Sequence, residues 1–197
     1  MHSSDSLHVP STLVELLCQK ALQYPERHAF TFLNDGEQEG DHLTYHYLDC
    51  RARAIAVFLQ QRTVPGDRAL LVYPPGLEFI TAFFGCLYAG VIAVPAYPPQ
   101  TRAKRGLVKL QAIANDIQPS VVLLTSSIST TVEGLFEDMP ALLATPLITT
   151  DHIADDLAAT WRNPRISSDT PTRLPRCRSE LDCPPGSPGA TPSFSPG

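Results

Sequence analysis

The spacing of Gly85 and Gly90 is that of a P-loop, the glycine-rich turn that binds nucleotide phosphates. In a P-loop the second glycine is followed by a lysine and by a serine or threonine. Here Val91 and Ile92 occupy those two positions. The lysine that would neutralise the phosphates is absent, and the two glycines lie in a helical pattern instead of after a strand. We interpret the spacing as coincidence and predict no phosphate site there.

No other motif with a catalytic mechanism is present. The sequence contains no GxGxxG, GxSxG or HExxH pattern, and no HxE followed by CxxC. Nicotinamide-dinucleotide, serine-hydrolase and zinc-deaminase chemistry are therefore unsupported. The six histidines are scattered, and the five cysteines form no CxxC pair of the kind that binds zinc. The sequence thus nominates no catalytic, cofactor-binding or metal-binding residue.

Two local features leave alternatives open. The first is a basic cluster, which suits either a phosphate or an acidic protein partner, although a solvated loop and helix entry is the favoured interpretation. It consists of Arg102, Lys104, Arg105 and Lys109. The second is Tyr97-Pro98-Pro99. This tripeptide is equally compatible with one wall of a ligand cleft and with a rigid crossover.

Composition and charge set the broad class. The 197 residues are 43% hydrophobic and 18% charged, as in one soluble globular domain. A net charge of −5 with 15 Lys and Arg residues disfavours nucleic-acid binding. The first ten residues have neither the basic nor the apolar region of a signal peptide, so we expect a cytoplasmic protein.

The uncharged stretch Phe79 to Pro95 raises the alternative of a membrane span. It is near the lower limit of about 17–25 residues for such a span, it contains two glycines, and it lacks basic flanks. A core helix followed by a core strand explains the stretch better. We therefore predict no membrane span.

The first third of the chain predicts two helices around two short strands. Thr12 and Glu15 have the spacing of a capping box for a helix over 11–24. Strands are predicted at 28–33 and 42–45, around a polar loop over 34–40. A helix over 45–62 follows, capped by Thr44. Its buried face is predicted to contain Leu48, Ala52, Ile55, Ala56 and Leu59, and its exposed face Arg51, Arg53, Gln60 and Arg62.

The middle of the chain alternates apolar runs with helical patterns. Strands are predicted at 68–73, 91–94 and 120–125, and helices at 77–89 and 107–117, with Gly90 ending the first helix. This order predicts an α/β fold with a mainly parallel sheet flanked by helices. A helix over 131–143, a strand over 146–149 and a helix over 153–161 are predicted to follow.

Composition changes after Asp169. The segment 170–197 contains seven of the nineteen prolines and only three large apolar residues. Such a segment cannot bury enough surface to offset its ordering entropy. We predict one domain over 11–169 and a disordered, Pro-rich tail over 170–197.

Three segments of this sequence resemble the AMP-forming acyl ligases. They are LTYHYLDCRARAIAVFLQ (43–60), GDRALLVYPPGLEFITAFFGCLYAGVIAVPAYPP (66–99) and LQAIANDIQPSVVLLT (110–125). LTYHYL is similar to the first motif of the adenylation-domain superfamily. CLYAGVIAVPAYPP is similar to the second, in the form that fatty acyl-AMP ligases favour. The resemblance covers about residues 11–169, and implies the N-terminal subdomain of the acyl-adenylating ligase fold.

The resemblance also implies a function. Fatty acyl-AMP ligases use ATP and Mg²⁺ to convert a fatty acid to an acyl-adenylate. They pass the acyl group to an acyl carrier protein in lipid, polyketide or nonribosomal peptide biosynthesis. Such catalysis depends on backbone amides, a lysine and Mg²⁺ placed around the phosphates.

The sequence departs from the family where the phosphate loop is expected, near residues 168–170. It reads PTRLPRCRSELDCPPGSPG there. No family catalytic, cofactor-binding or metal residue is therefore carried over. The expectation is a fragment of such a ligase, truncated before the phosphate loop and inactive by itself. A frameshift, a pseudogene fragment or an assembly error would each explain the change of sequence. The alternative is a non-enzymatic interaction module, or one half of a split ligase that another chain completes. A third possibility, a nucleotide-binding α/β domain of another class, is supported only by the alternation of strands and helices.

Overall fold

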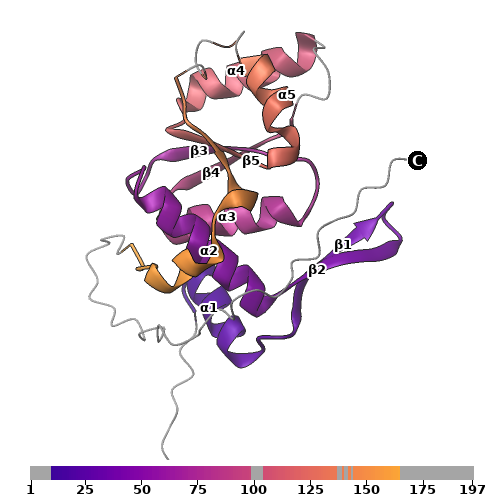
Figure 1. Ribbon diagram of the computed structural model, residues 1–197, viewed down its shortest axis with the longest axis vertical. Helices are drawn as coiled ribbons and strands as arrows, with labels where there is room; N and C mark the ends of the chain where they lie inside the picture. The colour runs from indigo at the N-terminus through magenta and orange to yellow at the C-terminus, as the bar shows by residue number, and fades with distance from the viewer. Residues whose placement is uncertain (1–9, 99–103, 137–138, 140–141, 143, 165–197) are drawn as a thin grey trace, which may run out of the picture.

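The computed structural model describes residues 10–98, 104–136, 139, 142 and 144–164. Its body is a parallel sheet between two layers of helices, from which a β-hairpin projects (Figure 1). The sheet consists of β3 (Arg68–Val72), β4 (Ile92–Ala96), β5 (Val121–Leu124) and β6 (Leu147–Thr149), in the order β4-β3-β5-β6. All three strand pairs are parallel. The predicted α/β fold and its parallel sheet are confirmed.

Alternate residues of each strand face opposite helical layers. Leu71 and Leu123 lie in the core shared with α2 (Tyr45–Gln60) and α3 (Leu77–Ala89). Leu70 and Val122 lie in the core shared with α4 (Lys104–Ile117) and α5 (Ser126–Phe136). Both faces of the sheet are therefore covered, as the continuous apolar runs predict for a parallel sheet.

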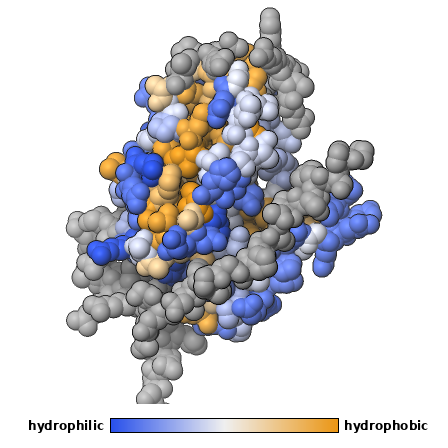
Figure 2. Space-filling view, in the orientation of Figure 1, coloured by the Kyte–Doolittle hydropathy of each residue, from blue (hydrophilic) through white to orange (hydrophobic). Residues whose placement is uncertain are grey.

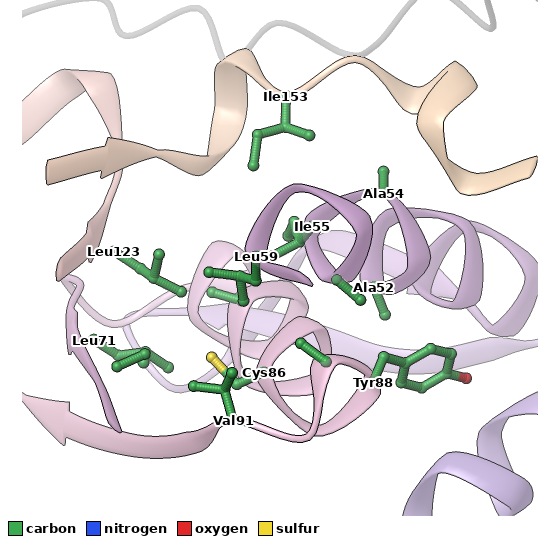
Figure 3. Packing of buried hydrophobic residues seen from close by; sticks show 14 of the residues in the cluster. Ala52, Ala54, Ile55, Leu59, Leu71, Cys86, Tyr88, Val91, Leu123 and Ile153 are labelled. Atoms are coloured by element: carbon green, nitrogen blue, oxygen red, sulfur yellow. The ribbon is translucent and has the colours of Figure 1, made fainter. Parts of the chain in front are cut away.

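Helix α2 lies between α3 and the segment that carries Ile153 (Figure 3). Its predicted apolar face is confirmed, because Leu48, Ala52, Ile55, Ala56 and Leu59 are all inaccessible to solvent. Its predicted exposed face is wrong for Arg51 and Arg53. The Arg51 residue is only 6% exposed, and the Arg53 side chain is largely covered. Segments distant in sequence pack on this side of α2, which a local helical pattern cannot indicate.

The two glycines with P-loop spacing have structural roles. A Cβ atom on Gly85 would lie 2.7 Å from Cβ of Ile55, so the glycine lets α3 approach α2 closely. Gly90 ends α3 in the left-handed conformation with φ of 76°, and its amide donates to the carbonyls of Cys86 and Leu87. The predicted role of Gly90 is confirmed.

Replacing Gly85 by alanine should therefore destabilise the fold. We expect the free energy of unfolding to fall by about 1–3 kcal/mol in urea titrations, because the added methyl group overpacks the α2–α3 contact. The matched control is Gly134→Ala in α5, where an added Cβ meets no atom within 4 Å. That substitution should raise stability by about 0.5–1 kcal/mol. Equal changes in the free energy of unfolding for the two substitutions would show that the close approach of α2 and α3 at Gly85 does not affect stability.

The N-terminal elements form a helix and a hairpin. Helix α1 (Leu13–Gln23) begins after Thr12, whose hydroxyl accepts the Glu15 amide at 3.1 Å, as predicted. Strands β1 (His28–Asn34) and β2 (Gln38–Thr44) pair antiparallel. The predicted polar loop over 34–40 is wrong, because β2 begins at Gln38. Asp35 and Gly36 both have positive φ, and this tight Asp-Gly turn shortens the connection.

Three predicted helices differ from the structure. Helix α4 begins at Lys104 instead of residue 107, and α5 begins at Ser126 instead of residue 131. Most of 137–143, the end of the predicted helix, lies outside the described residues. Asp151 caps the start of α5 from a distant part of the chain. In place of the α-helix predicted over 153–161, the structure has a short 3₁₀ helix, η2 (Asp155–Thr160), and another, η1 (Thr150–His152), precedes it. Such tight turns commonly form short connectors.

Hydrophobic side chains gather over the body of the molecule, whereas the β1–β2 hairpin is mainly hydrophilic (Figure 2). The stretch Phe79 to Pro95 forms most of α3 and β4, as predicted. Within the described residues, no helix is long and apolar enough to cross a membrane. The predicted tail over 170–197 lies outside the described residues.

Candidate functional site at the carboxyl edge of the sheet

The strand order identifies one edge of the sheet as the candidate site. From β3 the chain passes through α3 to β4 on one side, and from β5 it passes through α5 to β6 on the other. Strands β3 and β5 are neighbours, yet α3 and α5 belong to opposite helical layers. This arrangement is a topological switch point. In open α/β sheets, ligands bind beyond the carboxyl ends of the strands at such a point.

A buried hydroxyl pair joins the strand ends there. The Tyr73 hydroxyl lies 2.7 Å from the Thr150 hydroxyl, and Thr150 Oγ1 also donates to the Leu124 carbonyl at 3.4 Å. These residues stand at the ends of β3, β6 and β5. Burial raises the pKa of the Tyr73 phenol well above its ordinary value, so the group is neutral at physiological pH. The pair fixes the strand ends relative to one another.

Two helices begin at the same edge. The Ser126 amide, at the start of α5, donates to both carboxylate oxygens of Asp151, at 3.0 and 3.1 Å. The Ser126 hydroxyl donates to the same carboxylate. Helix α3 follows Gly76, which supplies no side-chain hydrogen bond to its first turn. The α5 amide is therefore capped by Asp151, whereas the first turn of α3 has no such side-chain cap.

Glu78 is the acidic residue in the first turn of α3. Partial burial, the largest influence, raises the pKa of its carboxyl group; Arg51 opposes this effect and Asp151 adds to it. A carboxylate near a helix N-terminus also interacts favourably with the helix dipole.

Arg51 reaches this edge from α2. Its guanidinium donates to the carbonyls of Thr150 and Ile153, each at 2.8 Å, and forms an ion pair with Asp155. The helical pattern predicts an exposed Arg51, whereas the residue is buried. Its acceptors lie 99 to 104 residues away along the chain, so no local pattern indicates them.

This edge of the sheet brings together helix amides, hydroxyl groups and the Glu78 carboxylate. Among the described residues, no group of three or more His, Cys, Asp or Glu side chains is placed to hold a metal ion. The edge contributes shape and hydrogen-bonding groups.

Of the two features left open by the sequence, Tyr97 lies at this same edge. It directly follows β4, whose last residue Ala96 pairs with Val72 of β3, and it is 59% exposed. Pro99 and Arg102 lie outside the described residues, and Lys109 is an exposed residue of α4. The other residues at this edge are not candidates from the sequence, although one signal is available. Tyr73, Thr125 and Thr150 each follow directly after an apolar strand, where ligand sites of parallel sheets lie.

Comparison with known proteins places the chain in a family. The family model for the AMP-binding enzymes matches residues 17–183. A medium-chain-fatty-acid–[acyl-carrier-protein] ligase, JamA of Moorena producens, is 44% identical over 178 residues, covering 89% of this chain and 30% of that protein. A long-chain-fatty-acid–AMP ligase, FadD32 of Mycolicibacterium smegmatis, is 39% identical over 128 residues, covering 65% of this chain and 20% of that protein.

Solved structures of similar proteins support the same family. The crystal structure of a fatty acid AMP ligase from Legionella pneumophila is 39% identical with a TM-score of 0.70, covering 80% of this chain and 26% of that one. A fatty acyl-adenylate ligase from the same organism, in complex with acyl adenylate and pyrophosphate, has a TM-score of 0.67 at the same identity and coverage. The chain spans about 30% or less of the length of these relatives. It belongs to the AMP-binding enzyme family, and its relatives are fatty acyl-AMP ligases.

Proposed function

We propose that this chain is the N-terminal, ligand-positioning part of a fatty acyl-AMP ligase. Such a ligase joins a fatty acid to the AMP part of ATP, which gives an acyl-adenylate and releases pyrophosphate. It then transfers the acyl group from the adenylate to an acyl carrier protein. The observation that carries the proposal is 44% identity over 178 residues to a fatty-acid–[acyl-carrier-protein] ligase. The similarity to an enzyme that binds acyl adenylate and pyrophosphate supports it.

In this proposal the described residues hold the substrates and do not supply the main electrostatic catalysis. Attack of a carboxylate on the α-phosphorus brings two anions together, so cations must stabilise the transition state. The edge formed by Tyr73, Glu78 and Thr150 provides no metal-ligand cluster among the described residues. The Mg²⁺ ligands and the lysine would then come from further polypeptide. Residues 11–169 as the folded unit, with 170–197 as a separate tail, remain part of the proposal.

A chimeric ligase tests the proposal. Residues 11–164 would replace the equivalent segment of the JamA-type relative, and fatty-acid-dependent ATP–pyrophosphate exchange would be measured. The proposal expects exchange within about tenfold of the intact relative. A folded chimera with no exchange, beside an active parent, would contradict it. Adding the remainder of the relative as a separate polypeptide tests the split-ligase alternative in the same assay.

A further inference from the structure

Arg51 connects helix α2 to the segment 149–155. This segment, called the loop below, runs from the last residue of β6 through η1 to the first residue of η2. We propose that Arg51 is a positioning residue, which holds this loop in place as one wall of the ligand site at the switch point. The inference rests on the proposed function for its link to catalysis. Its geometric part concerns the chain alone.

The contacts of Arg51 are numerous and directional. One terminal nitrogen, Nη2, donates to the Thr150 carbonyl at 2.8 Å. The other, Nη1, donates to the Ile153 carbonyl at 2.8 Å and to the Asp155 carboxylate. The arginine is buried, whereas Asp155 is 54% exposed. The planar fork of the guanidinium holds two donor nitrogens at fixed positions, whereas a lysine would have to reach the three acceptors from one nitrogen.

The loop that Arg51 holds contains the two residues that organise the switch point. Thr150 contacts the ends of β3 and β5 through its hydroxyl, while its carbonyl accepts from Arg51. Asp151 caps the first amide of α5 at Ser126. A shift of this loop would therefore displace a strand-end contact and a helix cap together. In positioned sites, a misplacement of about 1 Å can cost about 10²-fold in rate.

Arg53 provides a matched comparison. It lies on the same helix and forms a buried ion pair with Asp49, with Nε to Oδ2 at 2.8 Å. Its guanidinium lies over the Trp161 ring, with 5.0 Å from Cζ to the ring centre. None of the hydrogen bonds found for Arg53 among the described residues joins the loop 149–155. Loss of Arg53 should thus cost stability without moving the loop.

The geometric part is tested on the 197-residue chain by hydrogen exchange. In Arg51→Met we expect amides of residues 150–155 to exchange at least tenfold faster than in the parent chain. Arg53→Met should leave those amides within about twofold. Asp155→Asn removes only the negative charge that pairs with Arg51, and should give a smaller acceleration of hydrogen exchange in the same amides. It provides the test if Arg51→Met does not fold. Unchanged exchange in the folded variants would overturn the assignment.

The catalytic part is tested in the chimera by measuring kcat/KM beside thermal stability. Arg51→Met should lower kcat/KM for the fatty acid or ATP by about 10–100-fold at temperatures where the variant is folded. Arg51→Lys should recover part of the lost thermal stability but not kcat/KM, since an ammonium group lacks the fork. Arg53→Met should lower the midpoint of thermal unfolding yet leave kcat/KM within about threefold. Equal kinetic losses in the Arg51 and Arg53 variants would show that Arg51 acts only through stability. An inactive parent chimera would count against the proposed function. The hydrogen-exchange result on the 197-residue chain would still decide whether Arg51 holds the loop 149–155.

Discussion

Replacement of Asp49 by alanine is expected to lower the free energy of unfolding by about 3–5 kcal/mol. Asp49 is 2% exposed and accepts hydrogen bonds from the Tyr88 hydroxyl at 2.7 Å and from Arg53 Nε at 2.8 Å. Removing the carboxylate leaves the Arg53 guanidinium largely buried without its counter-charge, and leaves the Tyr88 hydroxyl without this acceptor. Urea titration followed by circular dichroism measures the loss.

Two further variants make the Asp49 prediction specific. Asp156→Ala removes an exposed carboxylate, and should change stability by less than about 0.5 kcal/mol. The double variant Asp49→Leu with Arg53→Met replaces the ion pair with apolar groups, and should recover much of the loss. A loss below about 1 kcal/mol for Asp49→Ala would show that the ion pair is solvated in solution.

The second large effect concerns catalysis. A polypeptide of these 197 residues, purified alone, should give no fatty-acid-dependent ATP–pyrophosphate exchange. Removing one donor that stabilises a developing charge costs about 10²–10³ in rate. The sequence near residue 170 has no glycine-, serine- and threonine-rich loop with a lysine, and the described residues hold no metal-ligand cluster. Exchange clearly above a boiled control would reveal a phosphate site that neither the sequence nor the described residues indicate.

The parallel sheet was predictable because its signals are local. The runs that form β3, β4 and β5 are apolar over consecutive residues, and the helix between the first two is closed by Gly90. Local backbone preference and burial agree in these elements. The family resemblance was equally accessible, since its motifs lie in continuous segments such as 66–99.

The candidate site was not predictable by the same means. The burial of Arg51 depends on carbonyl groups about 100 residues later in the chain, and the start of α5 depends on a carboxylate at position 151. Tyr73 and Thr150 meet only because β3, β5 and β6 are neighbours in the sheet. Contacts of this kind follow from strand order, which the apolar pattern alone does not define.

A ligand at the carboxyl edge of this sheet should protect the amides of that edge from hydrogen exchange. Hydrogen exchange of the chimeric ligase would be recorded with and without a non-hydrolysable acyl-adenylate analogue. We predict protection in residues 73–79, 125–128 and 149–155, with no change at the opposite edge, in 64–68 and 118–121. Protection confined to the opposite edge, or absent from all three carboxyl-edge segments while the analogue is bound, would show that the ligand lies elsewhere.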